Sequence, residues 1–256
     1  FESGHGFLVR TPDLETVTLF WPRHPRRFRH LLAPAVREGR RLEAYLALLA
    51  RDEVEYISVK VSSVSSQIDL TAFRHTVEIV KDRLRALYRQ ALLHHYRHPD
   101  GRVTPKFVNL DMEEYRDLAL TVTAFQEVLD EDEFLALPAG IVLQAYLPES
   151  HRVQRALVAW ATARCGRGGA PIKLRVVKGA NLAMERIEAD LHGWPQAPFT
   201  RKADVDANFK RMIEYGSRPE HARAVHLGIA SHNLFDVAHG LVLREARGVE
   251  AWVEFE

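Results

Sequence analysis

Short apolar runs that end in a polar residue recur along the chain and predict a series of buried strands. The run from Lys173 to Ala180 combines Val176 and Val177, which favour strands, with Arg175 and Lys178, which are costly to bury without partners. Four other runs follow the same pattern, over residues 56–60, 106–111, 140–146 and 224–230. We therefore expect five strands, each with a polar residue at or near its C-terminal end.

Helical periodicity separates these runs. Apolar residues recur at three- and four-residue spacing over about 71–96, 113–129, 151–163, 183–191, 204–215 and 234–246. Asn233 is placed to cap the last of these helices, and Gly248 is placed to end it. The alternation of strands and helices predicts a parallel sheet.

Two architectures can hold such a sheet. A doubly wound sheet usually carries a glycine-rich turn after its first strand, but no G-x-G-x-x-G follows a strand here, and the glycines from Gly166 to Gly169 precede one. A (β/α)₈ barrel collects its functional groups from the C-terminal ends of many strands. The polar strand ends favour the barrel, an α/β fold of the TIM type.

The strand count does not reach eight. A sixth strand is expected over Val249–Glu256 and an additional early strand over residues 16–20. We expect a helical and loop segment over residues 1–50, followed over 51–256 by a distorted barrel that is incomplete at the C-terminus of this chain, before its last strands and helix.

Charge and cysteine content narrow the functional classes. The chain has 35 Lys and Arg against 34 Asp and Glu, so its bulk charge indicates neither nucleic acid nor a membrane surface as a partner. A single cysteine, Cys165, fits a reducing compartment. No apolar run approaches the roughly 20 residues of a spanning helix.

The strand ends would bring three cations, one carboxylate and several hydrogen-bonding groups to one mouth of the barrel. These residues are Lys60, Asp111, Gln144, Arg175, Lys178, His232 and Asn233. They form neither a nucleophilic triad nor a zinc ligand set, so we expect no metal site. The positive mouth suits an anionic ligand. Two chemistries stay open from the residues alone: a Schiff base on a strand-end lysine, or a flavin whose reduced form is stabilised by arginine and lysine.

Six ordered motifs carry a family resemblance. They occupy residues 57–62, 109–114, 142–146, 174–180, 199–202 and 230–233. In this order they resemble the proline dehydrogenase family, including the proline dehydrogenase domain of bifunctional proline utilization proteins. The resemblance covers residues 55–256.

The resemblance implies a distorted (β/α)₈ barrel that holds FAD and oxidises L-proline to Δ1-pyrroline-5-carboxylate, with hydride transfer to flavin N5 and a quinone as electron acceptor. It implies catalytic roles for Lys60 beside the substrate carboxylate, Asp111 in the substrate pocket and Arg175 near flavin N5. The cofactor-binding residues that it implies are Asp111, Gln144, Arg175, Val177, Lys178, Gly179, Ala180, Thr200, Arg201, Lys202, His232 and Asn233.

Two departures from the family pattern stand out. Asn181 and Leu182 replace an aromatic pair that many relatives carry. The family's arginine pair for the proline carboxylate lies on the last barrel helix, beyond this chain.

For the whole protein, the resemblance points to a cytoplasmic location with peripheral contact to the inner membrane face. It also points to a C-terminal aldehyde dehydrogenase domain and a homo-oligomer. The alternative functions are a lysine Schiff-base lyase on the same barrel and a non-catalytic barrel that serves as a binding module.

Overall fold

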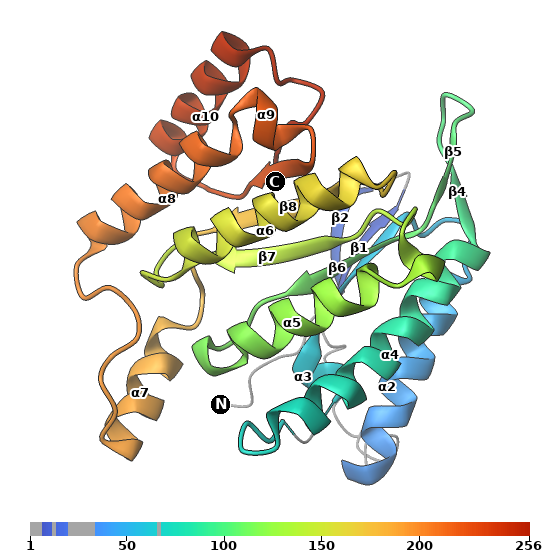
Figure 1. Cartoon of the computed structure of the whole chain (residues 1–256), viewed down its shortest axis with the longest axis horizontal. Coiled ribbons are helices and arrows are strands. Elements are labelled where there is room, and N and C mark those ends of the chain that lie inside the picture. Colours follow the sequence, from blue (N-terminus) through green and yellow to red (C-terminus); the bar gives the residue numbers. More distant parts are fainter. Residues whose placement is uncertain (1–6, 12–13, 20–33, 66–67) are drawn as a thin grey trace. The chain divides into compact units, whose positions relative to one another are not determined.

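Two compact units make up the chain in the computed structural model, which describes residues 7–11, 14–19, 34–65 and 68–256. The first unit comprises Phe1–Asp111 and Ala119–Leu137, and the second comprises Met112–Leu118 and Pro138–Glu256. Strands and helices are present in both units (Figure 1).

The main strands of the first unit combine parallel and antiparallel pairing. They are β1 (Phe7–Thr11), β2 (Leu14–Leu19), β3 (Tyr56–Lys60) and β6 (Phe107–Asp111). β3 and β6 are parallel and stay in register over their whole length, and β1 pairs antiparallel with both β2 and β3. The three central residues of β3 and of β6 are buried, and the polar residue at the centre of each strand is satisfied, because Asn109 Nδ2 donates a hydrogen bond to Ser58 Oγ at 3.0 Å.

Helices and a small hairpin complete the first unit. They are α2 (Pro34–Leu49), α3 (Val61–Val64), α4 (Phe73–Leu93), the hairpin of β4 (His95–Arg97) and β5 (Val103–Pro105), α5 (Leu118–Leu129) and the 3₁₀ turn η2 (Asp132–Phe134). The apolar face expected on α4 is buried, with Val77, Val80, Leu84 and Leu87 excluded from solvent. These positions follow the helical repeat, so one face of α4 packs into the core.

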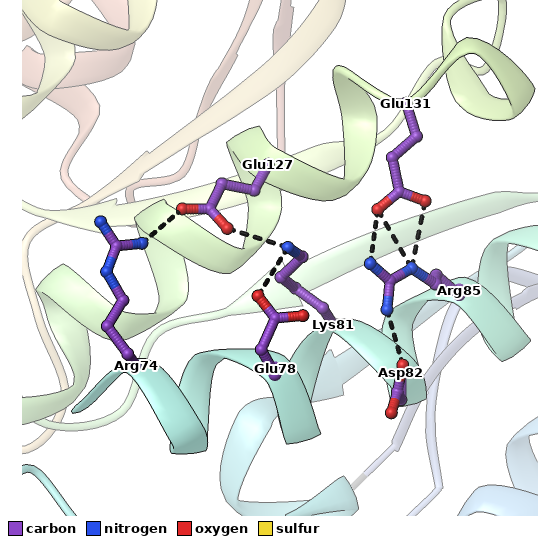
Figure 2. Close-up of polar contacts among 7 residues, drawn as sticks. All are labelled: Arg74, Glu78, Lys81, Asp82, Arg85, Glu127 and Glu131. Atoms are coloured by element: carbon purple, nitrogen blue, oxygen red, sulfur yellow. Dashed lines mark hydrogen bonds and ion pairs between the residues drawn. The ribbon is translucent and has the colours of Figure 1, made fainter. Parts of the chain in front are cut away.

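Ion pairs connect α4 to α5 and to Glu131, which follows α5 (Figure 2). The Glu127 carboxylate accepts hydrogen bonds from Arg74 Nη1 at 2.9 Å and from Lys81 Nζ at 3.0 Å. One helical turn further on, Arg85 donates from Nε and Nη2 to Glu131 Oε1, at 3.0 and 2.7 Å. These ion pairs connect α4 to the α5 segment at successive turns of α4.

Four parallel strands form the sheet of the second unit, in the order of the chain. They are β7 (Gly140–Gln144), β8 (Ile172–Val177), β9 (Val225–Ile229) and β10 (Val253–Phe255). All of β7 is buried, whereas β8 alternates between buried and half-buried residues. β8 therefore turns one polar face away from the apolar core.

The helices of the second unit follow its strands. They are the 3₁₀ turn η1 (Tyr115–Asp117), α6 (Ser150–Gly166), α7 (Leu182–His192), α8 (Lys202–Gly216), α9 (Pro219–Ala222) and α10 (Leu234–Arg247). Three of them lie between β8 and β9, where a regular β/α repeat has one. As expected, Asn233 caps α10 by accepting a hydrogen bond from Phe235 N at 2.9 Å, and Gly248 ends it at a φ of 62°.

The α/β class is confirmed, and the strand order agrees with the barrel. Successive parallel strands are neighbours in the second unit, whereas a doubly wound sheet reverses its order at a switch point. The strand expected over Val249–Glu256 is shorter, because Trp252 N and Val253 N both donate to Val249 O in a turn. The early strand is present as β2 over residues 14–19, while Phe20 lies outside the described residues. Within the described part of the chain, no helix is long and apolar enough to cross a membrane.

Candidate functional site

In the first unit, two candidate residues lie side by side at the ends of neighbouring strands. Lys60 ends β3 and Asp111 ends β6, and the two are register partners. Adjacent strands are about 4.8 Å apart, so a cation and a carboxylate share one edge of this sheet. Lys60 also immediately precedes the short α3, and its carbonyl accepts a hydrogen bond from Ser63 Oγ at 2.6 Å.

In the second unit, Arg175 lies on the polar face of β8. Its Nε lies 2.8 Å from Glu256 Oε2, and the neighbouring Lys173 ammonium lies 2.6 Å from Glu256 Oε1. Gly228 on β9 is the register partner of Arg175, and a Cβ at Gly228 would lie 2.6 Å from Glu256 Oε1. The glycine thus leaves room for the carboxylate that balances both cations.

Lys178, just beyond the end of β8, is held between two helices. Its ammonium lies 2.6 Å from Asp206 on α8 and 2.6 Å from Asp236 on α10. Burial alone would lower the pKa of Lys178, but the hydrogen bonds to these two carboxylates outweigh it and raise the pKa. Lys178 is therefore a protonated bridge between α8 and α10.

Gln144 is 2% exposed and links two loops. Its Nε2 donates to the Glu113 carbonyl at 3.1 Å, and its Oε1 accepts from Ala180 N at 3.4 Å. Asn181 Nδ2 donates to the same Glu113 carbonyl at 2.6 Å. These hydrogen bonds connect Gln144 to Ala180, and they connect both Gln144 and Asn181 to the Glu113 carbonyl. Asn181 is one of the two residues that depart from the family pattern.

Gly179 has a φ of 124°, in the region that side chains rarely adopt. A Cβ at this position would lie 2.4 Å from Cδ1 and 2.7 Å from Cγ of Tyr146. The close approach that Gly179 permits is therefore made by the Tyr146 ring. Val177, two residues before Gly179, lies on the same half-buried face of β8 as Arg175.

The remaining candidates lie at the start of two helices. Thr200, Arg201 and Lys202 lead into α8, and the side chains of Arg201 and Lys202 are 74% and 77% exposed. Arg201 pairs with Asp204 within its own helix. His232 and Asn233 are exposed at the start of α10.

Sequence reasoning missed Tyr146 and Glu185. Glu185, in the first turn of α7, accepts hydrogen bonds from Tyr146 Oη at 3.2 Å and from Tyr115 N at 2.6 Å. Burial raises the pKa of Glu185, and it also raises that of Tyr146 together with the Glu185 charge. The only sequence signal was an acid in the first turn of a helix, which is common at solvent-exposed positions.

A pocket of about 410 Å³ lies beside α7. Glu185, Glu188 and Trp194 contribute to its wall together with Glu114 and Tyr115. The described residues contain no group of three or more His, Cys, Asp or Glu side chains that could hold a metal ion.

The donor set of the second unit fits the flavin that the resemblance implies. The start of α8 has no side-chain cap on its backbone N–H groups and carries two exposed cations, which is the chemistry that a diphosphate requires. The Gln144 carboxamide and the Arg175 guanidinium are polar groups that suit the edge of a ring system rich in hydrogen-bonding atoms.

Comparison with known proteins gives one consistent family. The family described as proline dehydrogenase matches residues 26–256. No curated protein matches the chain at a significant level.

Solved structures agree with this match. Proline utilization A from Corynebacterium freiburgense is 48% identical, with a TM-score of 0.79 over 86% of this chain and 22% of its own. Proline utilization A from Bdellovibrio bacteriovorus, inactivated by N-propargylglycine, is 31% identical, with a TM-score of 0.73 over 86% of this chain and 24% of its own. A mutant of proline utilization A from Bradyrhizobium japonicum shares the fold, at 23% identity and a TM-score of 0.72 over 86% of this chain and 22% of its own. The chain thus spans about a fifth to a quarter of the length of these relatives.

Proposed function

The chain belongs to the proline dehydrogenase family, and we propose from this that it is the part of a flavoenzyme that oxidises L-proline to Δ1-pyrroline-5-carboxylate. The family match over residues 26–256 carries the proposal. The arrangement of donors at the strand ends and helix starts of the second unit supports it.

FAD is the proposed cofactor, and the chemistry that it supplies when bound is acceptance of a hydride at N5. Gln144 and Arg175 would contact the ring, and Val177, Lys178, Gly179 and Ala180 would provide the loop beside it. Thr200, Arg201 and Lys202 would bind phosphate or ribose through exposed donors, and His232 and Asn233 would lie on the adenosine side.

The first unit would act on the substrate. The Lys60 ammonium would pair with the proline carboxylate, and Asp111 would organise the pocket through hydrogen bonds. The two side chains are suited to this because they end adjacent parallel strands.

The lyase alternative is less well supported. A Schiff base needs a neutral amine, whereas two carboxylates within 2.6 Å keep Lys178 protonated.

For the whole protein, we extend the proposal to its partners. One similar structure is described as a bifunctional proline utilization A protein, which supports a second functional domain, and the family resemblance suggests that this domain is an aldehyde dehydrogenase. A quinone as electron acceptor, a cytoplasmic location with peripheral membrane contact and a homo-oligomer remain proposals from the resemblance.

The test uses the protein at its full natural length. We expect it to take up FAD with visible absorbance near 450 nm, and L-proline to bleach that absorbance without oxygen. A protein that neither carries nor takes up FAD would refute the proposal.

Lys60→Met should lower proline turnover at least tenfold while bound flavin is largely retained, because it removes the cation proposed for the substrate carboxylate. Lys210→Met, on the exposed face of α8, is the matched control and should leave turnover unchanged. Loss of flavin from Lys60→Met, without a specific effect on proline kinetics, would remove the role given to Lys60.

A further inference from the structure

The backbone of Tyr146 joins two of the loops proposed to bind FAD. Tyr146 lies two residues after Gln144, the last residue of β7, and its N–H donates to the Lys178 carbonyl at 2.8 Å. Its own carbonyl accepts a hydrogen bond from Phe199 N at 2.8 Å, immediately before Thr200. The loop after β8 and the segment that leads into α8 are therefore both tied to this one residue.

The ring of Tyr146 adds a steric contact to these hydrogen bonds. It occupies the space where Gly179 has no side chain, and Tyr146 as a residue is 2% exposed. A small rotation of this ring would move it into or away from the Gly179 backbone. The position of the ring is thus coupled to the conformation of the loop after β8.

The hydroxyl of Tyr146 is held by Glu185. Glu185 is 9% exposed, and its Oε1 accepts from Tyr146 Oη and from Tyr115 N. A buried carboxylate is costly unless hydrogen bonds replace its hydration, so these two donors fix its position. Tyr115 lies in the segment after β6, two residues beyond the Glu113 carbonyl that Gln144 and Asn181 bind.

We propose that Glu185 is a positioning residue for the cofactor: by anchoring the Tyr146 hydroxyl and the Tyr115 amide, it holds three loops in the conformation that binds FAD. These loops are residues 113–115, 178–181 and 199–202. The inference rests on the proposed function, because it concerns the same flavin site. Loops held in the bound conformation before the ligand arrives lose less entropy on binding, which increases affinity.

The test compares FAD affinity in three single variants of the full-length protein. Glu185→Ala removes the acceptor, and Tyr146→Phe removes only the hydroxyl while it keeps the ring beside Gly179. Glu188→Ala is the matched control, because Glu188 lies one turn further along α7, lines the same pocket and pairs instead with His192 on its own helix. We expect the first two to raise the Kd for FAD about fivefold to tenfold and the control to stay within twofold of wild type.

Two further measurements separate positioning from a general loss of stability. Glu185→Gln keeps an oxygen acceptor at the same place and should restore the FAD affinity to within about twofold of wild type. The double variant Glu185→Ala/Tyr146→Phe should bind FAD no more weakly than Glu185→Ala alone, because both changes break the same link. Backbone hydrogen exchange at Phe199 should accelerate in Glu185→Ala and not in Glu188→Ala.

The possible failures are distinguishable. Wild-type protein that binds no FAD refutes the proposed function and, with it, this inference. Wild-type protein that binds FAD while Glu185→Ala binds it equally tightly overturns the inference alone. Additive losses in the double variant, or no rescue by Glu185→Gln, would also overturn it.

Discussion

Replacement of Gly179 by alanine should destabilise the second unit strongly, because the added methyl group causes both backbone strain and a steric clash. At a φ of 124° a side chain costs about 1–3 kcal/mol in backbone strain. The new Cβ would also lie 2.4 Å from Tyr146 Cδ1, and relief of such overpacking typically costs about 1–3 kcal/mol. Gly179→Ala should therefore lower the free energy of unfolding by about 2–6 kcal/mol.

Urea unfolding followed by circular dichroism measures this loss, and Gly168→Ala provides the control. Gly168 also has a positive φ, of 84°, but a Cβ there would meet nothing within 4 Å. The control should therefore lose only about 1–2 kcal/mol, from backbone strain. In a double-mutant cycle, Tyr146→Ala should reduce the cost of Gly179→Ala, because it removes the obstructing ring. Equal losses for Gly179→Ala and Gly168→Ala would refute the steric argument.

Three further predictions concern charged side chains. Asp117 has a side chain that is 9% exposed, and burial, followed by repulsion from a neighbouring glutamate, raises its pKa to about 6. The folded state therefore binds more protons than the unfolded state between pH 3.8 and about 6, so this group lowers stability as pH rises through that window. Asp117→Asn should stabilise at pH 7.5 by about 1–3 kcal/mol but not at pH 4, and urea titrations that show equal effects at both pH values would contradict this. Arg85→Lys loses the paired hydrogen bonds to Glu131 and should cost about 0.5–1 kcal/mol; the loss should shrink in 1 M NaCl, and a salt-independent loss in thermal melts would contradict the ionic origin. Lys178→Met leaves the Asp236 charge buried without its cation and should cost about 2–4 kcal/mol, whereas Lys178→Met/Asp236→Asn should be more stable than the single variant; a less stable double variant in urea unfolding would be inconsistent with this.

Local signals in the sequence were sufficient for most elements. The strand expected over residues 56–60 is β3 to the residue, because its apolar run is bounded by polar positions on both sides. The start and end of α10 follow from Asn233 and Gly248 alone, since capping depends on the residues that cap. The start of β10 could not be predicted from the sequence. It depends on the turn at Val249, which positions the chain after α10 to pair with β9.

The candidate site was only partly accessible to such reasoning. Strand-end polar residues such as Gln144 are visible in the sequence because they interrupt apolar runs. Tyr146 instead looks like the end of an apolar run, and its contacts with Gly179 and Glu185 join segments more than 30 residues apart. Such contacts depend on how three loops pack against one another, and local sequence patterns do not predict this packing.

The partners of the cations in the second unit change how an anionic ligand could bind there. The sequence shows the cations Arg175, Lys178, Arg201 and Lys202 but not their partners, and in the structure each has a carboxylate partner. The pairs differ in exposure. Arg201 pairs with a carboxylate of its own helix at the surface, and exposed pairs of this kind are worth about 0–1 kcal/mol, so a phosphate can replace the partner at little cost. Lys178 contacts a carboxylate that is 3% exposed, and removal of that cation would leave a buried charge. The diphosphate of a bound nucleotide should therefore recruit the exposed cations at the start of α8, while Lys178 keeps its bridge and holds α8 and α10 in place around the ligand.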